Sequence, residues 1–180
     1  MDFTTAAAVA VDPNPTSPGC FTLPIITTAD NNPSSRRKKK DRMQTDDSIL
    51  PLITITSFGF HVSGIPDDPT GHGGGFIFDC RGLPNPGRDP RYAKQSGLDK
   101  PVAEFLRAVP EVDQFIDHAF ALIVLTASSF QQRRFPHLSV GFGCTGGQHR
   151  SVYCAERTAE KLRNAGFRVK LIHQDKPTFL

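Results

Sequence analysis

The segment GCTGGQHRS at residues 143–151 holds the residues whose types and spacing are best suited to chemistry. An apolar run precedes it and a run with helical periodicity follows, which predicts a strand, a tight glycine loop and a helix start. Such a loop directs backbone N–H groups and the positive end of a helix dipole at one small volume. Gly146 and Gly147 let an anion approach the backbone, and Arg150 could bind two of its oxygens. Because His149 and Arg150 would otherwise oppose the dipole, the sequence predicts an anion site here.

Cys144 gives the same loop a catalytic interpretation. It lies five residues before Arg150, which Ser151 follows, and this is the C-x5-R-[ST] spacing of the cysteine phosphatases. A helix N-terminus and a guanidinium both lower the pKa of a thiol and make it nucleophilic. In a phosphatase or phosphotransferase of this kind, Arg150 would hold the phosphate and Asp79 would be the general acid. The remaining interpretation is a small buried cysteine beside a simple turn, and we expect anion binding rather than catalysis, without a cofactor.

A second candidate cluster lies at the end of the apolar run GFIFDCR at residues 75–81. The run predicts a buried strand with Asp79 and Arg81 at its C-terminal end, where open α/β sheets place their ligands. If this strand neighbours the strand before the glycine loop, Asp79 could orient His149 or accept a hydrogen bond from a ligand hydroxyl, while Arg81 adds positive charge. The alternative is an Asp79–Arg81 ion pair that merely caps the strand.

Four strands and three helices are expected to position these residues. The strands are predicted at 50–60, 75–81, 138–142 and 167–172, and the helices at 99–110, 112–127 and 151–166, with Asp99 as an N-cap and Pro110 ending the first helix. A long irregular loop, rich in Pro, Gly and Arg, is predicted at 82–97. This alternation predicts an α/β layered fold, with a mostly parallel four-stranded sheet flanked by helices.

Residues 1–48 differ in composition from the rest of the chain. They are rich in Thr, Pro and Asn and contain the basic run RRKKK at 36–40. Without sustained apolar periodicity such a segment cannot offset its ordering entropy, so we expect it to be disordered. The basic run is a solvated tail, a nuclear-type address or an electrostatic arm for nucleic acid. A folded domain is predicted at 49–176, followed by a short tail at 177–180.

The composition is that of a globular protein of 180 residues, 38% hydrophobic and 22% charged. The net charge of +3 excludes a polyelectrolyte surface, so nucleic-acid binding would need a local patch. No apolar run is long enough to span a bilayer, and no signal peptide is evident, so we expect a cytoplasmic location. The four cysteines show no C-x-x-C pair or ligand spacing, which predicts reduced thiols and no metal.

Four motifs in order resemble the C-terminal domain of the RapZ (YvcJ-type) proteins. They are FGF at 58–60, FDCRGLPNP at 78–86, GLDKPV at 97–102 and GCTGGQHRSVY at 143–153, and the resemblance extends from about residue 53 to 175. It implies a compact α/β domain that is the RNA-binding part of an adaptor. That adaptor presents small regulatory RNAs to an endoribonuclease and senses glucosamine 6-phosphate.

The resemblance also implies a non-enzymatic regulatory role and a phosphosugar pocket built from both clusters. The partners implied are a phosphorylated small molecule, with an amino-sugar phosphate suspected, and RNA; a homo-oligomer is compatible with them. By motif, the pocket residues would be Asp79, Arg81, Asn85, Thr145, Gly146, Gly147, His149 and Arg150.

Three features depart from the family pattern. The chain lacks the P-loop motif of the family's N-terminal domain, Gly87 and Arg88 stand where a histidine follows Asn-Pro, and the segment at 173–176 is nearly neutral where the family tail is basic. Because phosphate contacts dominate RNA affinity, RNA binding here would need a substitute basic patch. The candidates for it are Arg88, Arg91, Lys94, Arg133, Arg134, Arg168, Lys170 and the basic run at 36–40.

Overall fold

A computed structural model describes residues 50–68, 70–71 and 74–175. The elements follow the order β1 (Leu52–Gly59), β2 (Gly75–Asp79), α1 (Lys100–Arg107), α2 (Pro110–Gln132), β3 (His137–Cys144), α3 (Arg150–Asn164) and β4 (Arg168–His173). Two short 3-10 helices, η2 (Cys80–Gly82) and η3 (Pro86–Arg88), follow β2. The segment predicted to be disordered, 1–48, and the tail at 177–180 lie outside the described residues.

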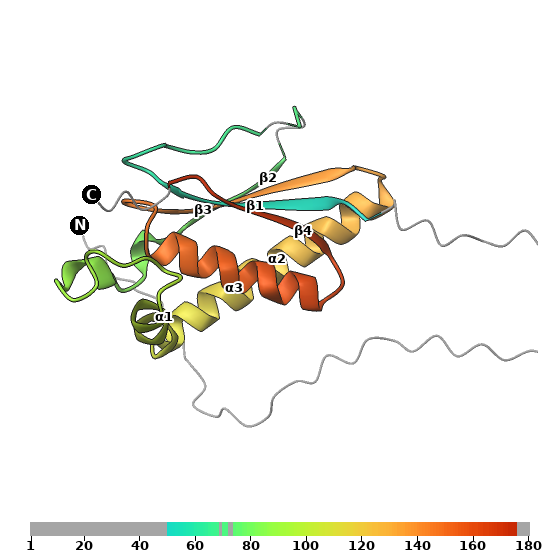
Figure 1. Ribbon diagram of the computed structural model, residues 1–180. Coiled ribbons are helices and arrows are strands. Elements are labelled where there is room, and N and C mark those ends of the chain that lie inside the picture. Colours follow the sequence, from blue (N-terminus) through green and yellow to red (C-terminus); the bar gives the residue numbers. More distant parts are fainter. Residues whose placement is uncertain (1–49, 69, 72–73, 176–180) are drawn as a thin grey trace, which may run out of the picture. The chain divides into compact units, whose positions relative to one another are not determined.

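The four strands form one parallel sheet in the order β2-β3-β1-β4. The predicted α/β layered fold is therefore confirmed, and all of its strand pairs are parallel. The three helices lie on one side of the sheet, and the connection between β1 and β2 crosses the other side (Figure 1). The described residues of this connection form no helix, because its Pro, Asp and Gly residues carry no helical apolar periodicity.

Alternation along the strands directs one set of side chains toward the helices. Ile53, Ile55, Val140 and Phe142 are completely or almost completely buried and pack in one cluster with apolar residues of α2 and α3. On the opposite face, Gly141 and Gly143 leave room for the ring of Phe58, which is fully buried against them. The core therefore lies between the sheet and the helices, and it fixes the direction in which β3 delivers the glycine loop.

Several predicted boundaries needed correction. The second strand ends at Asp79 instead of continuing to residue 81, so Arg81 lies in η2. Pro110 does not end a helix but starts α2, where its missing N–H costs nothing in the first turn. Asp99 occupies the N-cap of α1, but its carboxylate accepts hydrogen bonds from the N–H and hydroxyl of Ser96.

Within the described residues, no helix is both long and apolar enough to cross a membrane.

Candidate anion-binding site

The parallel pairing of β2 with β3 places the two predicted clusters side by side. Asp79 lies opposite Gly143 in the register, so η2 and the loop after Cys144 start from neighbouring strand ends. Two adjoining cavities, of about 440 and 240 Å³, lie between them and share Asn85, Thr145 and Arg150 in their walls. We call the larger, which includes Arg81 and Arg88, the outer lobe, and the smaller, which includes Gly146 and His149, the loop lobe.

Arg150 forms the common wall of the two lobes and is 95% buried. Its Nη1 donates to the carbonyl oxygens of Arg81 at 2.9 Å and Leu83 at 3.1 Å, and its Nη2 lies 3.5 Å from the hydroxyl of Thr145. Its Nε is buried without a hydrogen-bond partner among the described residues. A buried guanidinium N–H without a partner is costly. The Nη2 group, whose printed contact is the long one to Thr145, is the part of the guanidinium that could donate to an anion in the cavity.

Cys144 is one of the residues that line the loop lobe, and it is 3% exposed. Its Sγ is 3.1 Å from the hydroxyl oxygen of Ser151. Burial raises the pKa of this thiol, but hydrogen bonds from Ser151 and from the N–H of Gly147, together with the charge of Arg150, outweigh it and lower the pKa below 9.0. The loop therefore favours negative charge at its centre, whether on sulfur or on a bound anion.

Asp79 and Arg81 are paired with each other in the structure. The Nε and Nη2 of Arg81 bind the Asp79 carboxylate at 2.6 to 3.0 Å, and this carboxylate also accepts from the N–H of Arg81 at 2.9 Å. The hydrogen bond from the Arg81 side chain lowers the pKa of Asp79. The interpretation in which the pair caps the strand thus describes the observed contacts, and Arg81 additionally stacks 4.2 Å from the ring centre of Phe60.

His149 is oriented by a residue that sequence reasoning did not select. Its Nε2 lies 2.9 Å from the carbonyl oxygen of Tyr92. Tyr92, and not the sequence-based candidate Asp79, therefore orients the imidazole. Gln148 donates from its side chain to the carbonyl of Gln95 at 2.5 Å, and the N–H of Gly97 donates to the carbonyl of Gln148 at 2.9 Å. The predicted long loop at 82–97 is therefore held against the start of α3, and its η3 helix is capped by Asn85.

The two glycines of the loop have different surroundings. Gly147 has φ of +69°, and a Cβ there would lie 2.5 Å from the Asp175 carboxylate and 2.7 Å from the N–H of Gly59. A Cβ at Gly146 would meet nothing within 4 Å, because Gly146 faces the loop lobe. Asp175, near the end of the domain, accepts a hydrogen bond from the N–H of Gly59 at 2.5 Å. Sequence reasoning did not identify it as a structural or functional residue. No local motif marks it, since its partners are more than 100 residues away.

The basic residues considered for a substitute patch do not gather on one surface. Arg88, Arg91 and Lys94 lie in the loop beside the site, at the C-terminal edge of the sheet. Arg133 and Arg134 follow α2 and precede β3, at the opposite edge, and Arg168 and Lys170 are exposed on the outer strand β4. The run at 36–40 lies outside the described residues.

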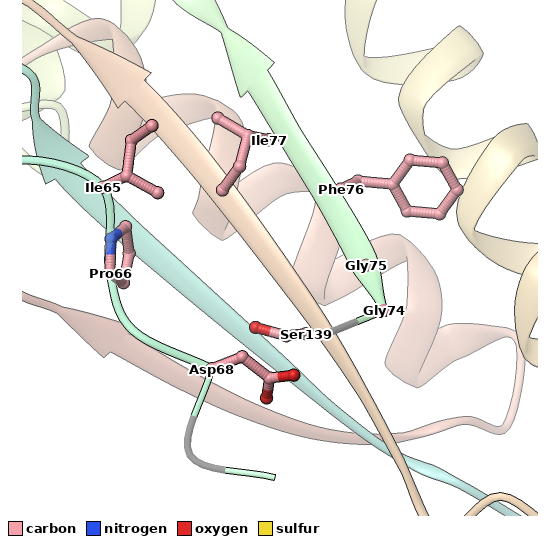
Figure 2. Close-up of a pocket in the computed structure, with 8 residues that line it drawn as sticks. All are labelled: Ile65, Pro66, Asp68, Gly74, Gly75, Phe76, Ile77 and Ser139. Carbon is pink, nitrogen blue, oxygen red and sulfur yellow. The ribbon is translucent and has the colours of Figure 1, made fainter. Parts of the chain in front are cut away.

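A further cavity, of about 200 Å³, lies on the helix-free face of the sheet. Figure 2 shows Ile65, Pro66 and Asp68 of the β1–β2 connection facing Ile77 and Ser139, while Phe76 points away from it. The described residues in its wall include no cation and none of the predicted site residues. The predicted residues instead converge at the C-terminal edge of the sheet, as expected for open α/β sheets.

The fold and the site define a class: a small α/β domain whose candidate anion-binding loop joins a parallel strand to a helix. A sequence profile of the family described as the RapZ C-terminal domain matches residues 51–177. The chain belongs to this family, as the four motifs predicted.

Relatives named as nucleotide-binding proteins share this region. One from Koribacter versatilis is 37% identical over 134 residues, which are 74% of this chain and 42% of that protein. One from Saccharophagus degradans is 44% identical over 122 residues, or 68% of this chain and 40% of that protein. One from Alkalilimnicola ehrlichii is 35% identical over 153 residues, or 85% and 51%. The chain thus spans about half the length, or less, of these curated relatives.

Proposed function

We propose that this domain binds a phosphorylated small molecule in the loop lobe and has a regulatory role. The observation that carries the proposal is Arg150, a guanidinium that is 95% buried and lines both lobes at the start of α3. A phosphate there would accept from Nη2 of Arg150, from loop amides and from the hydroxyl of Thr145, and the helix dipole would favour its charge. Gly146 leaves space for a close approach to the backbone.

Binding without turnover is the better-supported form of the proposal. A phosphatase needs a protonated general acid, but Asp79 is held ionised by the Arg81 guanidinium, which lowers its pKa. His149 engages the Tyr92 carbonyl through Nε2. Among the described residues that line the two lobes, no carboxyl group is available to protonate a leaving oxygen.

The lowered pKa of Cys144 favours a second candidate, a cysteine-dependent phosphatase or phosphotransferase. Release of phosphate from p-nitrophenyl phosphate by wild type, but not by Cys144→Ser, would establish it. We expect no release above background from either protein, while Cys144→Ser still binds inorganic phosphate.

RNA and an amino-sugar phosphate are the finer proposals that the family resemblance supports. Among the basic residues considered for a substitute patch, Arg88 lines the pocket and Lys94 lies in the same loop, whereas Arg91 pairs with Asp89. A mobility-shift titration across salt tests this: phosphate contacts require an affinity that falls steeply with salt, and insensitivity to salt would rule them out.

The central test uses a methyl group placed in the loop lobe. Gly146→Ala is expected to leave the melting temperature unchanged, because its Cβ has open space, but to weaken inorganic phosphate binding about tenfold by blocking close approach to the backbone. Gly82→Ala is the matched control, since its Cβ also has open space. Isothermal titration calorimetry measures the affinity. Equal affinities in all three proteins, or no phosphate binding by wild type, would contradict the proposal.

A further inference from the structure

Three cysteine thiols of the described residues lie in the core next to the glycine loop. Cys80 at the start of η2, Cys144 at the end of β3 and Cys154 in α3 are free and buried, and all belong to the apolar cluster between the sheet and the helices. Burial raises the pKa of the Cys80 thiol, and a hydrogen bond with Cys154 and the charge of Cys144 raise it further. The three thiols are therefore neighbours in the folded chain.

The register of the sheet brings two of these cysteines to adjacent strand ends. Cys80 directly follows Asp79, Cys144 directly follows Gly143, and the two preceding residues are partners in the parallel β2–β3 ladder. Neighbouring strands lie about 4.8 Å apart, and the Cα atoms of a disulfide usually lie about 4.4–6.8 Å apart. A bond between the two sulfur atoms is therefore compatible with the backbone at the ends of β2 and β3.

Of the three thiols, that of Cys144 is the one that a small reagent can reach. Cys144 lines the loop lobe, a cavity of about 240 Å³, whereas Cys80 and Cys154 are fully buried. Hydrogen peroxide is little larger than water, which occupies about 30 Å³ in the liquid, so the lobe can admit it. The lowered pKa of Cys144 supplies the thiolate, which is the form of cysteine that peroxides oxidise.

We propose that Cys144 is a peroxide-sensitive thiol whose oxidised form Cys80 converts to a disulfide. The Cys144 thiolate attacks one oxygen of hydrogen peroxide and the O–O bond breaks. The sulfur is oxidised by two electrons to a sulfenic acid, and the leaving hydroxide takes a proton from solvent to become water. The Cys80 sulfur then displaces the hydroxyl group from the Cys144 sulfur, and this group leaves as water with the proton of the Cys80 thiol.

The disulfide would join η2 to the end of β3. The two candidate binding cavities lie between η2 and the loop that follows β3, so the oxidation would link their walls covalently. This chemistry requires no ligand in either cavity, and its test is therefore independent of the proposed function.

Peptide mapping of the full chain after treatment with hydrogen peroxide tests the inference. Free thiols are blocked with N-ethylmaleimide in denaturant before digestion, which prevents exchange. Trypsin cleavage after Arg81 and Arg150 places the three cysteines on different peptides. We expect the unreduced digest to contain a peptide pair linked through Cys144 and Cys80, which dithiothreitol separates.

Cys80→Ala and Cys154→Ala form a matched pair of variants, because both cysteines are fully buried. In Cys80→Ala the linked pair should be lost and Cys144 should accumulate as a sulfenic acid, detected as a dimedone adduct. Cys154→Ala should keep the link between Cys144 and Cys80.

Mapping of the wild type needs no substitution, so it decides the question even if a variant does not fold. The inference is overturned if Cys144 of the folded wild type stays reduced, if it is carried to a sulfinic acid without a linked pair, or if it links to Cys154 or Cys20 instead of Cys80.

Discussion

At the scale of single residues, the site combines a buried guanidinium with a buried thiol whose surroundings favour its thiolate form. Ser151 is central to this, because its hydroxyl lies 3.1 Å from the Cys144 sulfur and hydrogen bonds from it lower the pKa of the thiol. The same surroundings that stabilise a thiolate would stabilise a bound phosphate. The low pKa of Cys144 is therefore compatible with a site built for binding.

Ser151→Ala should raise the pKa of Cys144, because it removes the hydroxyl donor that stabilises the thiolate. The pH midpoint for alkylation of Cys144 by iodoacetamide, followed by mass spectrometry, should move to higher pH. In the wild type, the stabilisation of the fold by the thiolate should be present above the ordinary pKa of 9.0 and be lost as the pH falls through the lowered value.

Cys80 is the internal control for this experiment. Burial raises the pKa of its thiol, so it should remain unlabelled over the same pH range in both proteins. An unchanged midpoint for Cys144 in Ser151→Ala would show that the hydroxyl does not stabilise the thiolate.

At the scale of elements, residues at the start of α3 hold the loop at 82–97 and η2 in place through hydrogen bonds. Gln148, just before this helix, forms hydrogen bonds with the backbone of Gln95 and Gly97 in the loop at 82–97. Arg150 donates to the carbonyl oxygen of Arg81 in η2. Both walls of the pocket therefore depend on this one helix terminus. The long loop is held in place because its backbone groups find partners in Gln148, His149 and Arg150 at the start of α3.

Gly97→Ala should weaken this contact. Its Cβ would overlap the carbonyl oxygen of His149 and lie 2.6 Å from the N–H nitrogen of Tyr153, both of which are backbone atoms. We expect a loss of about 1–3 kcal/mol in the free energy of unfolding, typical of overpacking, together with weaker phosphate binding. Urea denaturation measures the first effect. Gly82→Ala should show neither, and equal stability of the two variants would mean that the loop moves freely on α3.

At the scale of the whole molecule, the described residues form one apolar core. Its buried apolar residues all come from the sheet, its three helices and η2. The family profile also starts at residue 51, close to the predicted domain boundary. We therefore propose that residues 49–176 fold independently of the segment before them.

A chain shortened to residues 49–180 should keep the melting temperature of the full chain, because it retains every described contact of the core. Differential scanning calorimetry provides the comparison. A decrease of more than about 5 °C, which corresponds to about 1 kcal/mol for a domain of this size, would show that the N-terminal segment stabilises the fold. Phosphate affinity measured on both chains would show separately whether that segment affects the site.

Much of the fold could be predicted because local periodicity indicates strands and helices directly. The position of Asp99 as the N-cap of α1 is confirmed, but its side-chain contact and the place of Pro110 were not predicted, because tertiary contacts compete there with local preference. Asp99 has the residue type of an N-cap, yet its carboxylate binds Ser96, and Pro110 starts a helix although it also follows one. In both cases the surrounding loop decides which backbone groups need partners.

Residue types and motifs along the chain were enough to predict the family, the α/β order and the placement of a glycine loop between a strand and a helix. These features depend on residue type and on short-range spacing, because apolar periodicity along the chain indicates strands and helices directly. Tertiary contacts were needed to show that Asp79 pairs with Arg81, that Tyr92 orients His149, that Asp175 binds the N–H of Gly59 and that Arg88 lines the outer lobe. The last three depend on contacts between segments far apart in the chain, which the order of the strands in the sheet brings together.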